Sequence, residues 1–302
     1  MTPLRIGTRG SRLALWQANH VAGLLRPLAQ PRPVELVEIQ TAGDQDRDRP
    51  LAQLGGIGLF TKEIQRALLD GTADIAVHSL KDLPTIPVEG LVLAAVPPRG
   101  PTGDVFISHK HAQFDALPPG ARVATGSLRR RSQLLHRRPD LHLEPMRGNV
   151  DTRLRKLDEE NLDAIILAQA GLERLGLGSA ITHLLDPAWM LPAVGQGALG
   201  LECRADDTVT RALLQPLNDP ASHAAVTAER ALLAVLGGGC LVPIGALATV
   251  SSAELTLRAA VLSPDGKQRI DGDTRGPAAQ ASDLGRQLAD DLLGRGAKEL
   301  LS

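Results

Sequence analysis

Aromatic residues are scarce in this 302-residue chain: they make up 2% of the sequence and include no tyrosine. Proteins that bind single-stranded nucleic acid stack the bases on aromatic side chains. The chain therefore has almost nothing from which to build such a surface. A formal net charge of −1 also argues against a general binder of nucleic acid or of anionic membrane surfaces.

Cysteine is almost as rare, with two residues in the whole chain. Two cysteines do not make a disulfide framework, and no Cys-x-x-Cys pair or cysteine–histidine cluster offers a zinc site. No apolar run approaches the length of about 18 residues that a membrane span needs, and the first residues lack the apolar segment of a signal peptide. We therefore expect a cytoplasmic protein without a bound metal.

The composition that remains is that of an ordinary globular protein, with 43% hydrophobic and 22% charged residues. The length suits two or three domains of about 100 to 200 residues each. Strand and helix patterns alternate along residues 4–96 and again along 104–175, which is typical of α/β lobes. Gly/Pro-rich segments at 97–103 and 192–197 predict two crossings between these lobes, and hence a hinge.

From about residue 220 the pattern changes to a helix, three strands and a final helix, which predicts a small α+β domain with an antiparallel sheet. The predicted fold class is α/β, with two lobes joined by a hinge and a small C-terminal α+β domain. We assign residues 1–98 and 198–218 to lobe 1, 103–192 to lobe 2, and 220–302 to the C-terminal domain.

Cys240 follows three glycines, at the boundary between a helix pattern and a strand pattern. Glycine backbone is flexible and leaves the sulfur open to close approach, so a large group could be attached there. A free cysteine is equally often a small hydrophobic core residue. This stretch alone leaves both interpretations open.

Positive charge is concentrated in the second lobe. Between residues 122 and 156, ten Lys and Arg side chains face three acidic ones, an excess of seven positive charges. In a parallel α/β lobe, the C-terminal ends of the strands and the N-terminal ends of the helices line the same crevice. The planar guanidinium group of arginine can donate two parallel hydrogen bonds to one carboxylate. We expect an anion pocket formed by Arg129, Arg130, Arg147 and Arg153, and solvent-exposed faces for the other cations.

The equivalent loop of the first lobe carries Arg9 and Ser11. Asp82 follows another strand beside Lys81, and neighbouring cations would keep its carboxylate ionised, ready to handle a cationic intermediate. A helix cap or a surface ion pair with Lys81 is the simpler alternative for Asp82. His78 ends an apolar strand, which favours a structural role over that of a base.

Six motifs in the same order closely resemble those of the hydroxymethylbilane synthase (porphobilinogen deaminase) family over essentially the full chain. They span residues 8–17, 73–82, 127–130, 147–153, 191–197 and 238–245. The resemblance implies a cytosolic transferase of tetrapyrrole (haem-type) biosynthesis, with three domains and two lobes similar to a periplasmic binding protein. It implies head-to-tail condensation of four porphobilinogen molecules into linear hydroxymethylbilane, with release of ammonia.

The resemblance also implies roles for individual residues. The family holds a dipyrromethane cofactor through a thioether at the position of Cys240. Asp82 matches the catalytic carboxylate, which holds pyrrole N–H groups and stabilises positive charge as the aminomethyl group leaves, with proton transfer at the coupling carbon. The cofactor-binding residues would be Ser79, Lys81, Asp82, Thr125, Ser127, Arg129, Arg130 and Arg147. The substrate-binding residues would be Arg9, Ser11, Arg147, Arg153 and Gln196.

Three positions depart from the family pattern. Gly126 stands where the family often has serine, and Ile57 and Ala42 stand where it often has a cation. Residues 43–60 would form the lid over the active site. We expect the reaction to survive these changes, with lid contacts that differ from those of relatives.

The implied partner is porphobilinogen, a small polycarboxylate, with no nucleic acid and no membrane. The near-neutral charge and the lack of an obvious apolar stripe favour a monomer. Two other hypotheses stay open: a non-catalytic anion-binding module that kept the two-lobe fold, and a transferase that uses Cys240 as a nucleophile with His78. A covalent mass excess of two pyrrole rings would distinguish the synthase from both.

Overall fold

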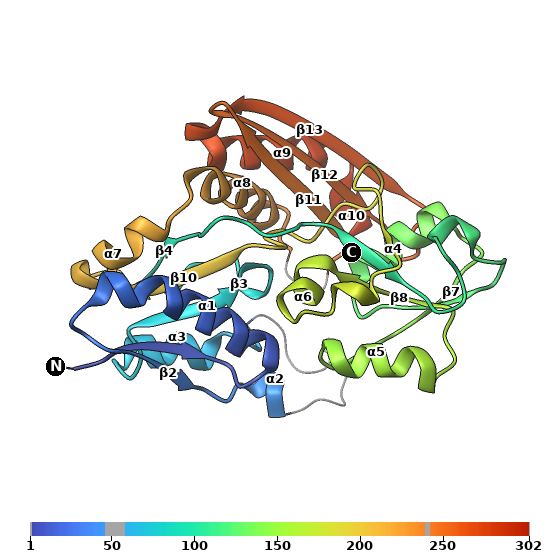
Figure 1. Ribbon diagram of the computed structural model, residues 1–302. Coiled ribbons are helices and arrows are strands. Elements are labelled where there is room, and N and C mark those ends of the chain that lie inside the picture. The colour runs from blue at the N-terminus through green and yellow to red at the C-terminus, as the bar shows by residue number, and fades with distance from the viewer. Residues whose placement is uncertain (1, 46–57, 239–241, 302) are drawn as a thin grey trace. The chain divides into compact units, whose positions relative to one another are not determined.

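The computed structural model describes residues 2–45, 58–238 and 242–301 (Figure 1). Within it the chain forms two compact units, Met1–Gly100 with Ala198–His223, and Pro101–Gly197 with Ala224–Ser302. Cys240, Ile57 and most of the predicted lid lie outside the described residues.

The first unit is built on a five-stranded sheet in the order β2-β1-β3-β10-β4. β1 pairs in parallel with β2 and β3, whereas β10, the first strand after the chain returns to this unit, runs antiparallel to β3 and β4. The strands are β1 (Leu4–Thr8), β2 (Val34–Glu38), β3 (Ile75–Ser79), β4 (Leu91–Ala95) and β10 (Leu199–Arg204).

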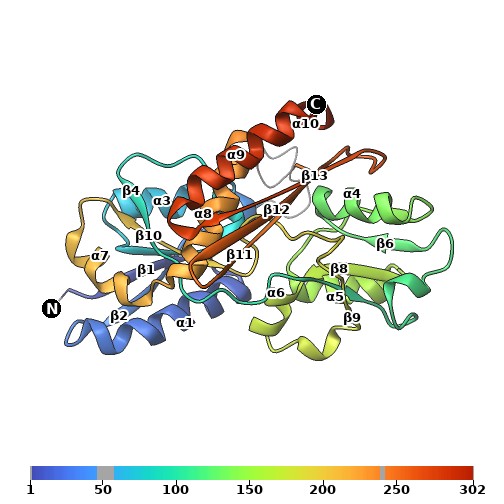
Figure 2. The same cartoon turned by 90° about the horizontal axis from the view of Figure 1, so that it is seen from above.

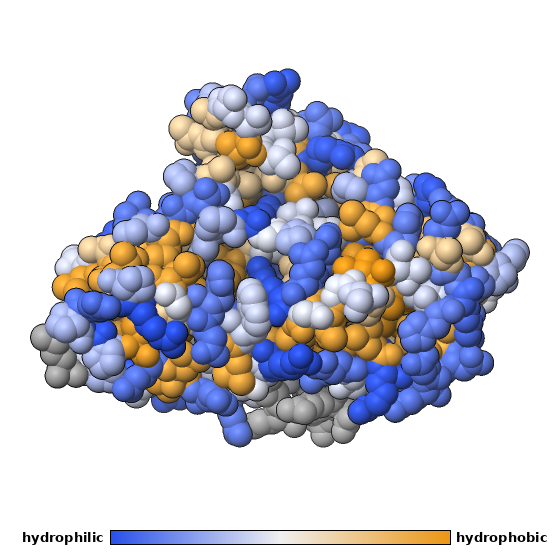
Figure 3. All heavy atoms as spheres, viewed as in Figure 1, coloured by the Kyte–Doolittle hydropathy of each residue, from blue (hydrophilic) through white to orange (hydrophobic). Residues whose placement is uncertain are grey.

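Helices cover both faces of this sheet, because successive residues of a buried strand point to opposite sides. Ile75 and Val77 of β3 pack with α1, while Ala76 packs with Ile64 and Leu68 of α3. The helical segments of the unit are α1 (Arg12–Ala29), α2 (Ala42–Gln45), α3 (Lys62–Leu69), η2 (Leu80–Asp82), α7 (Thr208–Leu214) and η5 (Gln215–Leu217). On the face shown in Figure 3, hydrophobic side chains gather over α1 and α7, which carry the exposed Leu24, Leu28 and Val209.

The second unit begins with a sheet of similar design, in the order β7-β6-β8-β5-β9. β6 is parallel to β7 and β8, and β5, the first strand after the chain crosses into this unit, is antiparallel to β8 and β9. The strands are β5 (Asp104–Ile107), β6 (Arg122–Ala124), β7 (His142–Glu144), β8 (Ala164–Ala168) and β9 (His183–Leu184). The helical segments are η3 (Phe114–Ala116), α4 (Leu128–Arg137), α5 (Val150–Glu159), α6 (Gln169–Arg174) and η4 (Gly178–Ala180).

The same unit contains a third sheet, of three antiparallel strands, β11 (Ile244–Ser251), β12 (Glu254–Leu262) and β13 (Arg269–Pro277). Figure 2 shows α9 (Ala281–Gly294) lying along this sheet. Apolar residues of α8 (Pro220–Val235), α9 and the sheet form one buried cluster. The short segments η6 (Ala278–Gln280) and α10 (Ala297–Leu300) complete the fold.

The α/β class with a small additional antiparallel sheet is confirmed. The helix expected after residue 220 is α8, which begins at Pro220. Proline suits the first turn of a helix, since the amide it lacks would have no partner there. The domain boundaries proposed from the sequence stay a prediction.

Candidate active site

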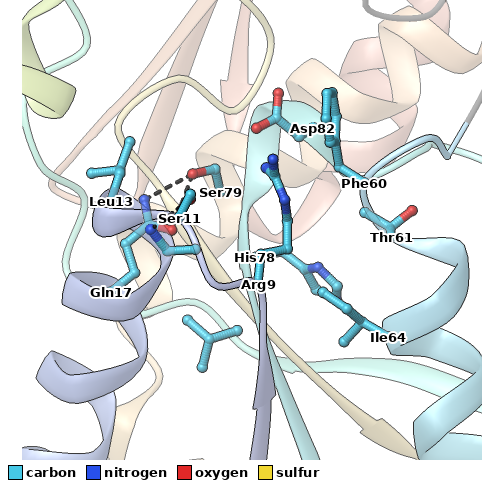
Figure 4. A pocket seen from close by; sticks show the side chains of 12 residues that line it. Arg9, Ser11, Leu13, Gln17, Phe60, Thr61, Ile64, His78, Ser79 and Asp82 are labelled. Atoms are coloured by element: carbon cyan, nitrogen blue, oxygen red, sulfur yellow. Dashed lines mark hydrogen bonds between the residues drawn. The ribbon is translucent and has the colours of Figure 1, made fainter. Parts of the chain in front are cut away.

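A pocket of about 70 Å³ lies in the first unit where β1 and β3 end (Figure 4). Its polar lining comprises Arg9, Ser11, Gln17, Thr61, His78, Ser79 and Asp82. Four of the residues selected from the sequence, Arg9, Ser11, Ser79 and Asp82, are therefore brought together in one place.

Hydrogen bonds within the first unit place the two serines of this pocket. Ser11 is the N-cap of α1, and its hydroxyl accepts a hydrogen bond from the amide of Ala14 at 3.3 Å. Ser79, the last residue of β3, accepts a hydrogen bond from Nε2 of Gln17 at 2.8 Å. Gln17 thereby fixes the end of β3 against the first helix (Figure 4).

The guanidinium group of Arg9 lies over the ring of Phe60, with 4.2 Å between its central carbon and the ring centroid. Phe60 in turn lies against Gly43, where an added Cβ would come within 2.2 Å of the ring. The amide of Gly43 donates a hydrogen bond to the carbonyl of Leu59 at 3.0 Å. The two described ends of the predicted lid therefore meet beside Arg9.

Asp82 ends η2, directly after β3. Its carboxylate makes no hydrogen bond or ion pair with the residues that the structure describes, and Ser79, not Asp82, occupies the N-cap position of η2. Neither alternative role considered for Asp82, a helix cap or an ion pair with Lys81, is found in the described part of the chain. The half-buried carboxylate is thus available to a ligand.

His78 lines the same pocket although it is only 4% exposed. Its Nε2 lies 3.1 Å from Oε2 of Glu202 on β10, whose side chain is 7% exposed. Nε2 of Gln65, on α3, donates to both oxygens of Glu202 at 3.1 Å. Side chains of β3, β10 and α3 therefore form one buried cluster, in which the carboxylate of Glu202 contacts the imidazole of His78.

In the second unit, the loops after β6 and β7 lie side by side. A Cβ on Gly126 would come within 2.4 Å of the carbonyl oxygen of Met146 and 3.9 Å of Nη2 of Arg153. Nε of Arg153 donates to the carbonyl of Gly148 at 2.8 Å. Nη1 of Arg147 is buried and has no hydrogen-bond partner among the described residues.

The hydroxyls of Thr125 and Ser127 are used locally in the loop after β6. Oγ1 of Thr125 accepts from the amide of Ser127 at 3.3 Å, and Oγ of Ser127 accepts from the amide of Arg130 at 3.4 Å as the N-cap of α4. Both side chains keep further lone pairs for a ligand. The loop between them is therefore held in a fixed shape beside Arg147 and Arg153.

Arg129 and Arg130 differ from the prediction of one pocket with four arginines. Both are buried, at 4% and 5% exposure, and both bind the completely buried Asp104 with N–O distances of 2.7 Å. Arg130 also donates to the carbonyl of Ile166 at 3.1 Å. Their contact with the cofactor stays a prediction.

Gln196 joins the same buried cluster. Its Nε2 donates to Asp104 at 2.8 Å and to the carbonyl of Thr102 at 2.7 Å, and the residue is 1% exposed. Glu229 of α8 accepts hydrogen bonds from the amides of Gly195 and Ala248, at 2.7 and 2.8 Å. Hydrogen bonds of Gln196 therefore connect the two segments at which the chain crosses between the units, residues 97–103 and 192–197. The contact of Gln196 with substrate stays a prediction.

Sequence reasoning missed Asp104, Glu202 and Phe60. Asp104 and Glu202 are single acidic residues inside apolar strands, a pattern that could have indicated a buried charge with a specific partner.

Burial raises the pKa of the other cysteine, Cys203, to about 11, so its thiol is unreactive.

No group of three or more potential ligands is placed to hold a metal ion within the described residues. None of the helices in that part of the chain combines the length and hydrophobicity needed to cross a lipid bilayer.

Comparison with known proteins covers nearly the whole chain. Residues 4–212 match the family described as "Porphobilinogen deaminase, dipyromethane cofactor binding domain", and residues 223–294 match "Porphobilinogen deaminase, C-terminal domain". The porphobilinogen deaminase of Pelobacter propionicus is 51% identical over 298 residues, which cover 99% of this chain and 96% of that protein.

Solved structures with low sequence identity also match. The methionine-binding protein MetQ is 15% identical, with a TM-score of 0.45 over 70% of this chain and 88% of that one. A periplasmic substrate-binding protein of an ABC transporter from Coxiella burnetii is 14% identical, with a TM-score of 0.44 over 76% and 97%. On the family matches and the 51% identity, the chain belongs to the porphobilinogen deaminase family.

Proposed function

We propose that Asp82 and Arg9 carry the chemistry of this family at the pocket of the first unit. The chain is a hydroxymethylbilane synthase, a transferase that condenses four porphobilinogen molecules and releases ammonia. The observation that supports the proposal is the Asp82 carboxylate, which lines the pocket and has no partner among the described residues. A carboxylate at this position would stabilise the positive charge that develops as ammonia leaves.

Arg9 and the hydroxyls of Ser11 and Ser79 would bind the acidic side chains of the substrate. Arg9 is suited to this because Phe60 supports one face of its guanidinium group, while the N–H donors lie in the plane of the group. A charge-assisted hydrogen bond from arginine contributes about 1.5 to 3 kcal/mol. Lys81, which follows Leu80 in η2, would add a further positive charge.

The residues of the second unit fit a cofactor with several carboxylates. Nη1 of Arg147 is buried without a described partner, a position that a carboxylate would satisfy. Arg153, Thr125 and Ser127 would supply the other donors. When bound through Cys240, the dipyrromethane supplies the pyrrole carbon on which the product is assembled. Arg129 and Arg130 would act indirectly, because their ion pairs with Asp104 would hold the loop after β6 in place.

Intact-mass measurement tests the attachment. Protein expressed in a host that makes haem is expected to carry a covalent excess of two pyrrole rings, and Cys240→Ser is expected to have the unmodified mass. Cys203→Ser is the matched control and should keep the excess, because its thiol is buried. An unmodified mass for the wild-type protein would refute the attachment.

Asp82→Asn tests the catalytic carboxylate. We expect the variant to keep its fold and cofactor while turnover falls by about 10²-fold or more, since a preorganised charge is removed. Asp70→Asn, at an exposed position of the same unit, should leave turnover unchanged. Near-normal turnover of Asp82→Asn would refute the assignment.

Arg147→Leu tests the second unit. The variant is expected to block attachment of the cofactor or an early addition, since it removes the buried Nη1 that has no described protein partner. Normal product formation would assign Arg147 to a structural role.

We also propose that the enzyme works in the cytoplasm as a monomer. The near-neutral charge supports a monomer, whereas the hydrophobic side chains over α1 and α7 are the surface at which self-association would occur. Light scattering after size exclusion should give the mass of one chain, 31.9 kDa plus the cofactor. Twice that mass would refute the monomer.

A further inference from the structure

The second unit contains a groove of about 500 Å³ that none of the residues assigned above to catalysis or binding lines. Its volume lies within the range of about 300 to 1,000 Å³ that is typical of small-molecule sites. Strands β12 and β13 supply most of its lining, and the rest comes from α4 and the segment after β9. Its charged and polar lining comprises His136, Arg258, Arg269, Asp271 and Asp273.

The hairpin of β12 and β13 is docked on α4 beside this groove (Figures 1 and 2). Nδ1 of His136 donates to the carbonyl of Gly266 at 2.8 Å, and Oγ of Ser132 donates to the carbonyl of Pro264 at 3.4 Å. A Cβ on Gly266 would lie 2.6 Å from the carbonyl oxygen of Ser132. The groove is therefore bordered by a close contact between two elements, and not by a free loop.

Two of the charged side chains in the groove neutralise each other. Nε and Nη2 of Arg269 donate to the carboxylate of Asp271 at 2.8 and 2.7 Å. Nη1 of the same arginine donates to the carbonyl of Trp189 at 3.0 Å, and its side chain is only 11% exposed. This pair holds β13 against the segment after β9 and leaves little charge for a ligand.

Arg258 and Asp273 also line the groove, but they are not paired. They lie directly opposite each other on β12 and β13, a position in which the Cβ atoms of two residues are about 4.5 to 5.5 Å apart and opposite charges can pair. Among the residues that the structure describes, neither side chain forms an ion pair. Nη2 of Arg258 instead donates to the carbonyl of Ala188 at 3.1 Å. The groove thus presents a cation and an anion side by side, each without a counter-charge in the described part of the chain.

The apolar part of the lining includes Trp189 and Leu191. Neighbours hold the indole of Trp189 in place: the guanidinium carbon of Arg137 lies 4.9 Å from the centroid of one of its rings, and the ring of Phe114 lies at 5.3 Å. A rigid aromatic side chain beside a few convergent polar groups is the usual composition of a small-molecule site.

We propose that this groove binds a small amphoteric molecule, with a carboxylate on Arg258, an ammonium group on Asp273 and an apolar body against Trp189 and Leu191. The planar guanidinium group suits a carboxylate, and a carboxylate suits an ammonium group. A ligand with only one charge would leave either Arg258 or Asp273 facing a like charge, which is unfavourable. Amino acids with apolar side chains share this chemistry with porphobilinogen, which carries an aminomethyl group and two carboxylates on a flat ring.

The two tryptophans of the chain allow a direct test, because each reports on a different site. Trp189 lines the groove, whereas Trp16 precedes Gln17, which lines the pocket of Asp82. Cofactor-loaded Asp82→Asn protein with isotope-labelled indole groups is titrated separately with L-phenylalanine and with porphobilinogen, which this variant consumes slowly. Trp16→Phe assigns the two indole signals.

We expect at least one of the two probes to move the Trp189 signal in a saturable way, with a Kd of about 1 mM or lower. The probe that does so identifies the source of the ligand, an amino acid or the pyrrole substrate. Binding of porphobilinogen in the pocket of Asp82 would move the Trp16 signal along a separate curve. A Trp189 signal that stays in place with both probes up to about 10 mM would overturn the proposal.

Arg258→Gln and Asp273→Asn remove one charge each. We expect each variant to weaken binding at Trp189 by at least tenfold and to leave the Trp16 curve unchanged. Lys267→Gln is the matched control, since Lys267 lies in the turn of the same hairpin with its side chain 84% exposed and does not line the groove. If Arg258→Gln fails to fold without its contact to Ala188, Asp273→Asn decides the question. An affinity like that of the wild type in a folded variant of either residue would overturn the proposal.

Discussion

Asp104→Asn is expected to destabilise the second unit strongly. The carboxylate of Asp104 is fully buried, with 0% of its side chain exposed, and it binds Arg129 and Arg130 at 2.7 Å each. Nε2 of Gln196 adds a hydrogen bond of 2.8 Å. The amide of the variant keeps one acceptor oxygen but no charge, so two buried guanidinium cations lose their counter-charge.

The size of the effect follows from this burial. Removing one partner of a buried ion pair costs about 3 to 5 kcal/mol, because the remaining charge stays in a low-dielectric environment. For a unit of this size, each kcal/mol lowers Tm by about 2 to 4 °C. We therefore expect a decrease in Tm of about 6 to 20 °C in the transition of the second unit.

Differential scanning calorimetry of the cofactor-loaded protein is the assay, with urea unfolding as a second measurement. Asp140→Asn is the control, because Asp140 also binds an arginine at 2.7 Å but lies at the surface with its side chain 36% exposed. We expect its Tm to stay close to that of the wild type, since solvent screens an exposed pair. Equal Tm changes in the two variants would refute the role given to burial.

Three further predictions concern single residues. Burial raises the pKa of Asp104, but the guanidinium groups of Arg129 and Arg130 outweigh this effect and hold the pKa well below its usual range. The stabilisation that results is present above about pH 4 and is lost as the pH falls further. The unfolding midpoint of Asp104→Asn should therefore depend less on pH below about 4 than the midpoint of the wild type does. Burial raises the pKa of the Cys203 thiol to about 11, so Cys240→Ser protein should react with iodoacetamide only after unfolding, and rapid labelling of the folded protein would contradict this. A Cβ at Gly126 would lie 2.4 Å from the carbonyl oxygen of Met146, so Gly126→Ala should lower the free energy of unfolding by about 1 to 3 kcal/mol in urea, and an unchanged midpoint would show that the loop can move.

The sequence by itself determined the local features of the site. Ser11 and Ser127 cap the helices that follow them, and strands β1 and β3 end where polar residues begin. These features depend on neighbours in the chain, since capping and hydrophobic periodicity act over a few residues. The motifs around Asp82 and Arg147 then sufficed to identify the family.

Tertiary structure decided which charges pair. From the sequence, Arg129 and Arg130 share an excess of positive charge with Arg147 and Arg153, and nothing local separates the two pairs. The first pair turns inward because β5 places Asp104 beside α4, while Arg147 keeps a buried nitrogen without a described partner.

The same holds for His78, which lies 124 residues from Glu202 in the chain. β10 returns from the other unit and inserts between β3 and β4, with Gly200 opposite His78, and this register places Glu202 within reach of the imidazole. Strand order and register depend on contacts throughout the sheet, so the short-range pattern of β3 showed only an apolar strand ending in histidine.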